Sequence, residues 1–154
     1  MSDELDGKDR AMERLTILQE QLNDTKNSIR EYKGLLGENE LSHKHGEFEG
    51  EIDYLNFQRG QIIREIHEIK EHENHYENSQ ALSFTQREIA ETRPEVDGML
   101  DADPQNPYLR DLRQGLANAE QELESKEREF AQGEKSPNQG REGQENRGRG
   151  GLAD

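Results

Sequence analysis

Histidine and glutamate side chains crowd one short stretch of the chain, and imidazole and carboxylate groups are common ligands of divalent metals. The stretch reads His67-Glu68-Ile69-Lys70-Glu71-His72-Glu73-Asn74-His75. In the zincin motif two histidines stand four residues apart, so that both face one ion. His67 and His72 are five apart, which on a helix turns the second imidazole away by ~140°. The motif fails by one residue.

The remaining members of the stretch share one helix face that lies off the apolar stripe: Glu68, Glu71, His72 and His75. Such a charged face is usually solvated. We therefore expect a solvated polar surface here and no metal-binding residues. A weak, adventitious Zn²⁺ or Ni²⁺ site is the alternative.

Groups that could support catalysis are missing or uninformative. The chain has no cysteine, no glycine-x-serine-x-glycine elbow and no phosphate-cradling glycine loop. Paired carboxylates carry no signal in a chain with 35 acidic residues. A thin helical seam also rarely forms a pocket that shifts a pKa. We expect no catalytic residues, no cofactor and no enzymatic activity.

Composition and charge narrow the class further. Only 28% of the 154 residues are hydrophobic, 36% are charged and the net charge is −15. So few apolar residues suit long helices that bury a narrow stripe. The negative charge opposes binding to nucleic acid or an anionic membrane. The acidic start, Met1 to Asp6, is no secretory signal, and no apolar run approaches the ~18 residues of a membrane span. The expected compartment is the cytoplasm, with the nucleus possible as the alternative.

Three segments repeat apolar residues at alternating spacings of three and four, which places them on one helix face. The predicted interface residues of the first segment are Leu15, Leu18, Leu22, Ile29, Tyr32 and Leu36. Those of the second are Phe48, Ile52, Leu55, Ile62, Ile66, Ile69 and Tyr76. Those of the third are Leu109, Leu112, Leu116, Leu123 and Phe130. The pattern predicts coiled-coil geometry or, alternatively, an ordinary helical bundle.

Breaks in this pattern set the expected boundaries. We expect helices near 8–36, 47–78, 81–102 and 107–132. Ser83 with Gln86 has the form of a capping box, and Pro94 predicts a kink or restart. Asn106 suits an N-cap, and Pro107 suits the first position of the last helix.

The predicted fold is all-α: an elongated coiled coil or helical-hairpin bundle with a disordered C-terminal tail. Residues 1–133 form the acidic helical coiled-coil region. Residues 134–154, rich in glycine, arginine, glutamine and asparagine, cannot bury enough apolar surface to fold.

Charges beside the apolar stripes differ in sign between the first and last segments. The first carries Arg14, Lys26 and Lys33, and the last carries Glu120, Glu122, Glu127 and Glu129. Flanking charges of opposite sign attract across a helix pair and select partners. We therefore expect residues 11–36 to lie alongside residues 108–132, within one chain or between two. The alternative is that these charges only solubilise the helices.

Several apolar residues lie off the stripes: Ile17, Tyr54, Phe57, Ile63, Phe84 and Leu100. A two-stranded coil would expose them. They predict either three or more helices in contact or a surface for another protein.

The expected function is that of a structural or adaptor protein that mediates protein–protein assembly, with itself or another helical protein as partner. One alternative is an acidic chaperone or scaffold for a basic client. Another is an RNA-associated accessory protein acting through Arg141, Arg147 and Arg149 of the tail.

Overall fold

The protein is a bundle of four helices, described by a computed structural model for residues 3–38 and 43–135 and for the side chains of 7–38 and 43–133. The helices are α1 (Asp3–Leu36), α2 (His45–His72), α3 (Ser79–Ala102) and α4 (Pro107–Lys135). The described residues contain no strand. The predicted all-α helical bundle is therefore confirmed. The disorder predicted for the tail concerns residues that, from 136 onward, lie outside the described part.

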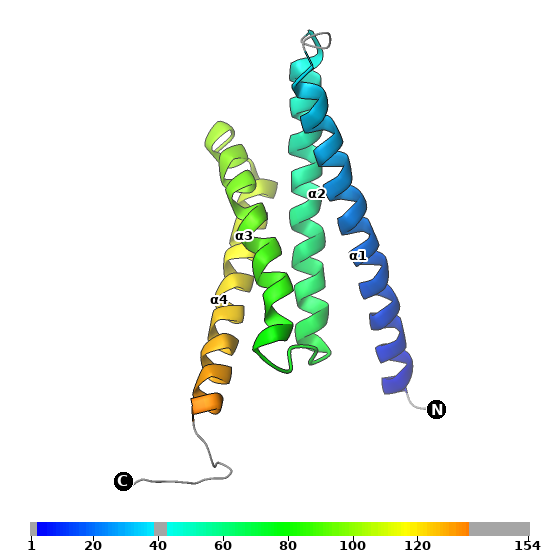
Figure 1. Ribbon diagram of the computed structural model, residues 1–154, viewed down its shortest axis with the longest axis vertical. Coiled ribbons are helices and arrows are strands. Elements are labelled where there is room, and N and C mark those ends of the chain that lie inside the picture. The colour runs from blue at the N-terminus through cyan, green and yellow to red at the C-terminus, as the bar shows by residue number, and fades with distance from the viewer. Residues whose placement is uncertain (1–2, 39–42, 136–154) are drawn as a thin grey trace.

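Helix α2 occupies the centre of the bundle (Figure 1). Helix α1 packs on one side of it, and the hairpin of α3 and α4 packs on the other. Among the described helices, the backbone of α1 lies close only to that of α2. The predicted pairing of residues 11–36 with residues 108–132 inside one chain is therefore wrong, because α2 lies between the two helices. Pairing between two chains stays a prediction.

Helices α1 and α4 bury narrow apolar stripes at the predicted spacing. The buried residues of α1 are Leu15, Leu18, Leu22, Thr25 and Ile29, and those of α4 are Leu109, Leu112, Leu116, Ala119 and Leu123. Tyr32, Leu36 and Phe130 are half-buried. Each leucine withdrawn from water stabilises the fold by ~1.5–3 kcal/mol. The remaining faces of both helices are charged and solvated.

Helix α2 buries a wider surface because helices pack on both of its sides. Its buried residues are Phe48, Ile52, Asn56, Gly60, Ile63, Ile66 and His67. The predicted interface residues Leu55, Ile62 and Ile69 are only half-buried. The buried face is thus rotated away from the predicted stripe and contains a second series with the same spacing: Asn56, Gly60, Ile63 and His67.

The junction between α2 and α3 differs from the prediction. Helix α2 ends at His72, six residues early, and Asn74 adopts a left-handed φ of 58°. Asparagine tolerates this conformation better than most residues, and it stops the helix. Asn78 then caps α3, because its side chain accepts a hydrogen bond from the Ala81 N–H at 3.0 Å. The predicted capping box is therefore wrong: Ser83 lies inside α3 and donates to the Gln80 carbonyl.

The other predicted breaks have mixed outcomes. Helix α3 runs continuously through Pro94, whose ring is exposed, so no restart occurs there. Leu82, Ile89 and Val96 remain buried on one face across it. The Asn106 side chain accepts hydrogen bonds from the N–H groups of Tyr108 and Leu109, at 2.9 and 3.2 Å. The predicted cap with Pro107 as the first helical residue is confirmed.

Two glycines let α2 and α4 approach closely. A Cβ atom added at Gly60 would lie 2.8 Å from Leu112 Cδ2. One added at Gly115 would lie 2.5 Å from Arg64 Nε. Neither position leaves room for a side chain without displacing its neighbour. The close approach brings the N-terminal half of α4 against the C-terminal half of α2.

Candidate functional site

Two surface hollows meet at Tyr54 and Phe57 of α2. The first, about 560 Å³, is bordered by α1 and lined by Gln21, Asp24, Thr25, Tyr54, Phe57, Gln58, Gln61 and Ile62. The second, about 460 Å³, lies towards α4 and is lined by Asp53, Tyr54, Phe57, Met99, Ala102, Asp103, Asn106, Tyr108 and Leu109. We call these two hollows together the trough. Its floor is α2, and α1 and the start of α4 form its walls.

Aromatic rings and acids dominate the trough. Tyr54 is 57% exposed and Tyr108 is 73% exposed, unusually high values for large apolar side chains. The lining residues include three aspartates, Asp24, Asp53 and Asp103, but no lysine or arginine. Burial, followed by the nearby charges of Glu49 and Glu95, raises the pKa of Asp53. The trough therefore offers apolar contact surrounded by uncompensated negative charge.

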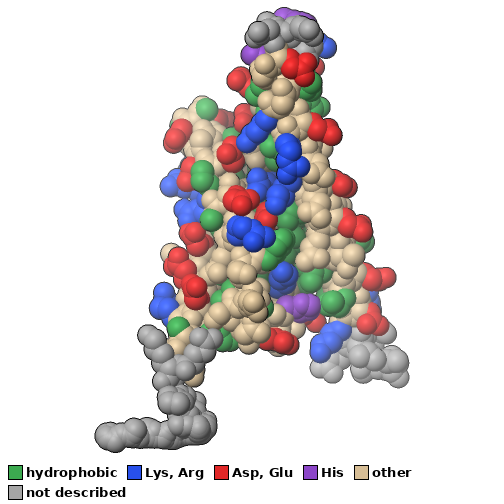
Figure 2. All heavy atoms as spheres, in the orientation of Figure 1, with side chains coloured by type: hydrophobic (Ala, Val, Ile, Leu, Met, Phe, Trp, Pro, Cys, Tyr) green, Lys and Arg blue, Asp and Glu red, His purple; other side chains and the backbone are tan. Residues whose placement is uncertain are grey.

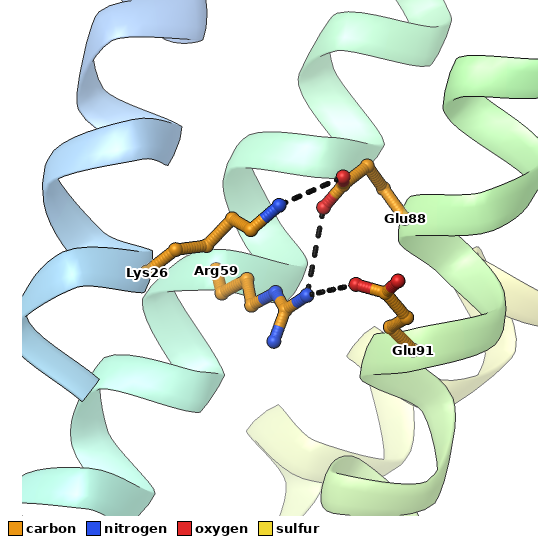
Figure 3. Close-up of polar contacts among 4 residues, drawn as sticks. All are labelled: Lys26, Arg59, Glu88 and Glu91. Atoms are coloured by element: carbon orange, nitrogen blue, oxygen red, sulfur yellow. Dashed lines mark hydrogen bonds and ion pairs between the residues drawn. The ribbon is translucent and has the colours of Figure 1, made fainter. Parts of the chain in front are cut away.

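A different arrangement occupies the opposite side of α2, where buried charges are balanced. Glu88 of α3 is 1% exposed and accepts from Lys26 Nζ at 2.9 Å and from Arg59 at 3.5 Å. Arg59 also pairs with Glu91 at 2.9 Å. Figure 3 shows the two cations reaching from α1 and α2 towards the two carboxylates of α3. We call these four residues the charge cluster.

The charge cluster also ties α1 to α3, whose backbones do not touch. Figure 2 shows basic and acidic side chains side by side over the middle of the bundle. Because each cation has a carboxylate partner inside the chain, the cluster has little left to offer a ligand. Its ion pairs join α1, α2 and α3.

The charges predicted to select a partner are satisfied mainly inside the chain. Arg14 pairs with Glu65 at 2.9 Å, and Lys26 pairs with Glu88. Glu120 pairs with Arg93, and Glu122 contacts His67 at 2.7 Å. The Glu127 carboxylate accepts from Gln86 at 3.3 Å. The opposite charges are thus on α2 and α3, the neighbours that α1 and α4 actually have; Lys33 and Glu129 form no ion pair among the described side chains.

Off-stripe apolar residues divide into two groups. Ile63 and Leu100 are buried, and Phe57 and Phe84 are half-buried, which agrees with contact among more than two helices. Tyr54 and Ile17 remain exposed, together with Met12 and Tyr108. Only Tyr54 and Tyr108 share a hollow. Met12 and Ile17 lie apart from it on α1.

In the histidine-rich stretch, the members of the expected polar face lie at the surface, whereas His67 is buried. Glu68 and His72 are exposed, and Glu71 and His75 are half-buried, so most of the expected polar face meets solvent. His67 instead is 3% exposed. Its Nδ1 lies 3.0 Å from the Tyr76 hydroxyl, and its Nε2 lies 2.7 Å from Glu122 Oε1 and 3.7 Å from Glu71 Oε1.

Sequence reasoning overlooked His67 as a buried residue because the chosen heptad placed it outside the interface. The second series on α2, which ends at His67, contains Ile63 as its only apolar side chain, so apolar spacing gave no signal for it. Tyr76 is buried as well, but it reaches the core from the loop after α2 rather than from a continued helix. Its Oη donates to Thr85 Oγ1 at 3.2 Å.

Comparison with known protein families, with curated proteins and with solved structures found no match to this chain. Among the residues described, no helix is long and apolar enough to cross a membrane.

Proposed function

We propose that the protein is a non-enzymatic helical adaptor whose trough binds a basic, amphipathic helix of another protein. The observation that carries this proposal is the pair of exposed tyrosines, Tyr54 and Tyr108, in an apolar hollow bordered by aspartates and free of basic residues. Tyrosine is enriched among the residues that dominate binding energy at protein interfaces. Exposed aromatic rings in a groove are correspondingly rare on surfaces that bind nothing.

A helix suits the shape of the trough. The backbones of α1 and α4 do not approach each other in the described bundle, so the surface of α2 between them stays open. A partner helix placed there would pack on Phe57 and Ile62 and fill the position left vacant between α1 and α4. Recognition of an amphipathic helix through apolar residues every three to four positions is a recurring binding mode.

A basic partner suits the charge of the trough. Asp24, Asp53 and Asp103 lie along it, and lysine or arginine side chains beside a helix's apolar stripe can reach such acids while their stems cover apolar surface. Burial, followed by the charges of Glu49 and Glu95, raises the pKa of Asp53, so a cation placed beside it would favour its charged form. A second copy of the chain fits less well, because each copy carries a net charge of −15.

Peptide binding tests this proposal. The probe is a fluorescent amphipathic helix of ~20 residues built from leucine and lysine, and its matched control replaces lysine with glutamate. Fluorescence anisotropy should show saturable binding of the basic peptide alone, weakening as salt rises. Tyr54→Ala with Tyr108→Ala should remove this binding. Both residues are exposed, so stability should change little.

A matched double variant, Met12→Ala with Ile17→Ala, removes similar exposed apolar surface outside the trough. It should bind the basic peptide as the unmodified protein does. Equal loss in both double variants would show that the peptide binds diffusely, as the alternative of a general acidic chaperone predicts. Light scattering that shows dimers which dissociate in the tyrosine variant would assign the trough to a second copy instead.

The RNA-associated alternative concerns residues 134–154, of which the structure describes no side chains. Truncation before residue 134 separates it from the adaptor proposal. Peptide binding in the trough should survive that truncation.

A further inference from the structure

The surroundings of His67 define a place for a cation. The Tyr76 hydroxyl lies 3.2 Å from Thr85 Oγ1 and 3.0 Å from His67 Nδ1, and the imidazole tautomer decides which group donates in the second contact. His67 Nε2 faces the Glu122 carboxylate at 2.7 Å. A bare nitrogen lone pair and a carboxylate oxygen repel each other at this distance, so a proton or a metal ion must lie between them.

We propose that His67, Glu71 and Glu122 form a binding site for a divalent transition-metal ion of the zinc class. On binding, the ion takes the place of the proton at His67 Nε2, and that proton leaves to solvent. The site shares no residue with the trough, and His67 lies about 20 Å beyond Tyr54 along α2 at 1.5 Å per residue. It therefore does not rest on the proposed adaptor function.

The three ligand atoms have suitable spacing. They all lie within 4.8 Å of one another, and Nε2 is 2.7 Å from Glu122 Oε1 and 3.7 Å from Glu71 Oε1. Zinc binds nitrogen and oxygen at ~2.0–2.2 Å, so two of its ligands in tetrahedral geometry stand ~3.3–3.6 Å apart. The half-exposed carboxylates can close the remaining gap by side-chain rotation. Three protein ligands leave a fourth tetrahedral position for water.

The second layer of contacts resembles what metal-binding histidines require. A hydrogen bond from the other ring nitrogen fixes the orientation and the tautomer of the imidazole. Tyr76 provides this contact, and its ring also stacks on His67 with centroids 5.7 Å apart. Burial of both side chains restricts the imidazole to one orientation. The anchoring nitrogen is thus positioned before any metal arrives.

The charge of the site also favours a cation. Among the described side chains, no lysine or arginine pairs with Glu71 or Glu122. Lys70, the residue before Glu71, instead places its Nζ atom 4.8 Å from the centre of the Phe84 ring. Two carboxylates therefore share one imidazole, and the negative charge that remains is uncompensated.

Calorimetric titration of the metal-free, full-length protein with ZnCl₂ tests this site. We expect one saturable ion per chain that also raises the melting temperature, because a ligand that binds only the folded state stabilises it. Glu122→Gln should weaken binding by more than the ~10–100-fold that a second-layer change costs. Tyr76→Phe should weaken it by about that amount. Since Glu122 is half-exposed, its variant should fold.

His72→Gln is the matched control, because His72 is an exposed histidine of the same stretch with a side chain 84% exposed. It should bind zinc as the unmodified protein does. If His72→Gln and Glu122→Gln bind equally well, or if zinc binds with no single saturable step, the ion is adventitious and the site does not exist.

Discussion

The charge cluster and the trough use the same part of α2 in opposite ways. On one side, Arg59 and Lys26 meet Glu88 and Glu91 of α3, so two cations face two carboxylates, of which Glu88 is buried. On the other side, Tyr54 and Phe57 face a hollow that contains aspartates and no cation. In this acidic protein, the basic residues Lys26 and Arg59 therefore lie where helices meet. The balanced charges join α1, α2 and α3, whereas the aspartates of the trough have no cation among its lining residues, and we therefore propose the trough, not the cluster, as the partner surface.

The largest effect should come from breaking the balanced side. Glu88→Gln keeps the shape of the side chain but leaves Lys26 and Arg59 without their buried carboxylate. Removing one partner of a buried ion pair costs ~3–5 kcal/mol. Urea denaturation followed by circular dichroism should show this loss. Glu91→Gln is the matched control: its carboxylate pairs with Arg59 but is 48% exposed, so we expect only ~0–1 kcal/mol. Equal losses would contradict the structural role of the cluster.

A smaller effect should come from the α2–α4 contact, which brings Glu122 to His67. Gly60→Ala places a methyl group 2.8 Å from Leu112 Cδ2, and Leu112 is fully buried. Overpacking of this kind costs ~1–3 kcal/mol. Gly50→Ala, on the same helix with nothing within 4 Å, should instead stabilise by ~0.5–1 kcal/mol. The two denaturation midpoints should therefore move in opposite directions. Gly60→Ala should also weaken zinc binding without touching a ligand.

The smallest effect should come from the unbalanced side. Burial, with Glu49 and Glu95 nearby, raises the pKa of Asp53 above its ordinary 3.8, so the folded protein holds that proton more tightly than the unfolded chain. Stability from this group is therefore present below pH 3.8 and lost as pH rises through the raised pKa. Asp53→Asn should be slightly more stable than the unmodified protein at pH 7, and the gain should fade as pH approaches 4.

The same Asp53→Asn variant should bind the basic peptide less tightly. A gain in stability accompanied by a loss of binding is the expected signature of a charge kept for a partner. Urea denaturation at pH 7 and near pH 4 measures the change in stability, and fluorescence anisotropy at pH 7 measures the change in affinity for the peptide. A variant that is less stable at pH 7, or that binds with unchanged affinity, would show that Asp53 is balanced after all.

The sequence predicted the simple helices better than the central one. Leu15, Leu18 and Leu22 repeat at three and four because α1 needs to cover only one neighbour, and a single stripe reveals a single contact. Helix α2 has neighbours on two sides, so its burial spreads to Asn56 and His67, which no apolar stripe can reveal. The Asn106 cap could be predicted from the sequence because capping depends only on nearby backbone groups.

Contacts between distant residues could not be read from spacing. The charges of α1 and α4 are complementary, yet the two helices do not meet, and residues of α2 and α3 pair with them separately. The trough joins Tyr54 to Tyr108, 54 residues later in the chain. Tyr54 was predictable as an off-stripe aromatic residue, but its pairing with Tyr108 depends on how the α3–α4 hairpin docks. Tyr76 reaches His67 only because α2 ends early, at His72.

The most direct test of the trough is a map of which backbone amides respond to a basic helix. Two-dimensional ¹⁵N–¹H NMR spectra of the labelled protein would be recorded during titration with the lysine–leucine peptide. We expect saturable shifts of the amide resonances around Tyr54, Phe57, Met99 and Tyr108. The amide resonances near Met12 and Ile17 should stay unchanged. Shifts spread evenly over the acidic surface, or centred on α1 away from the trough, would contradict it.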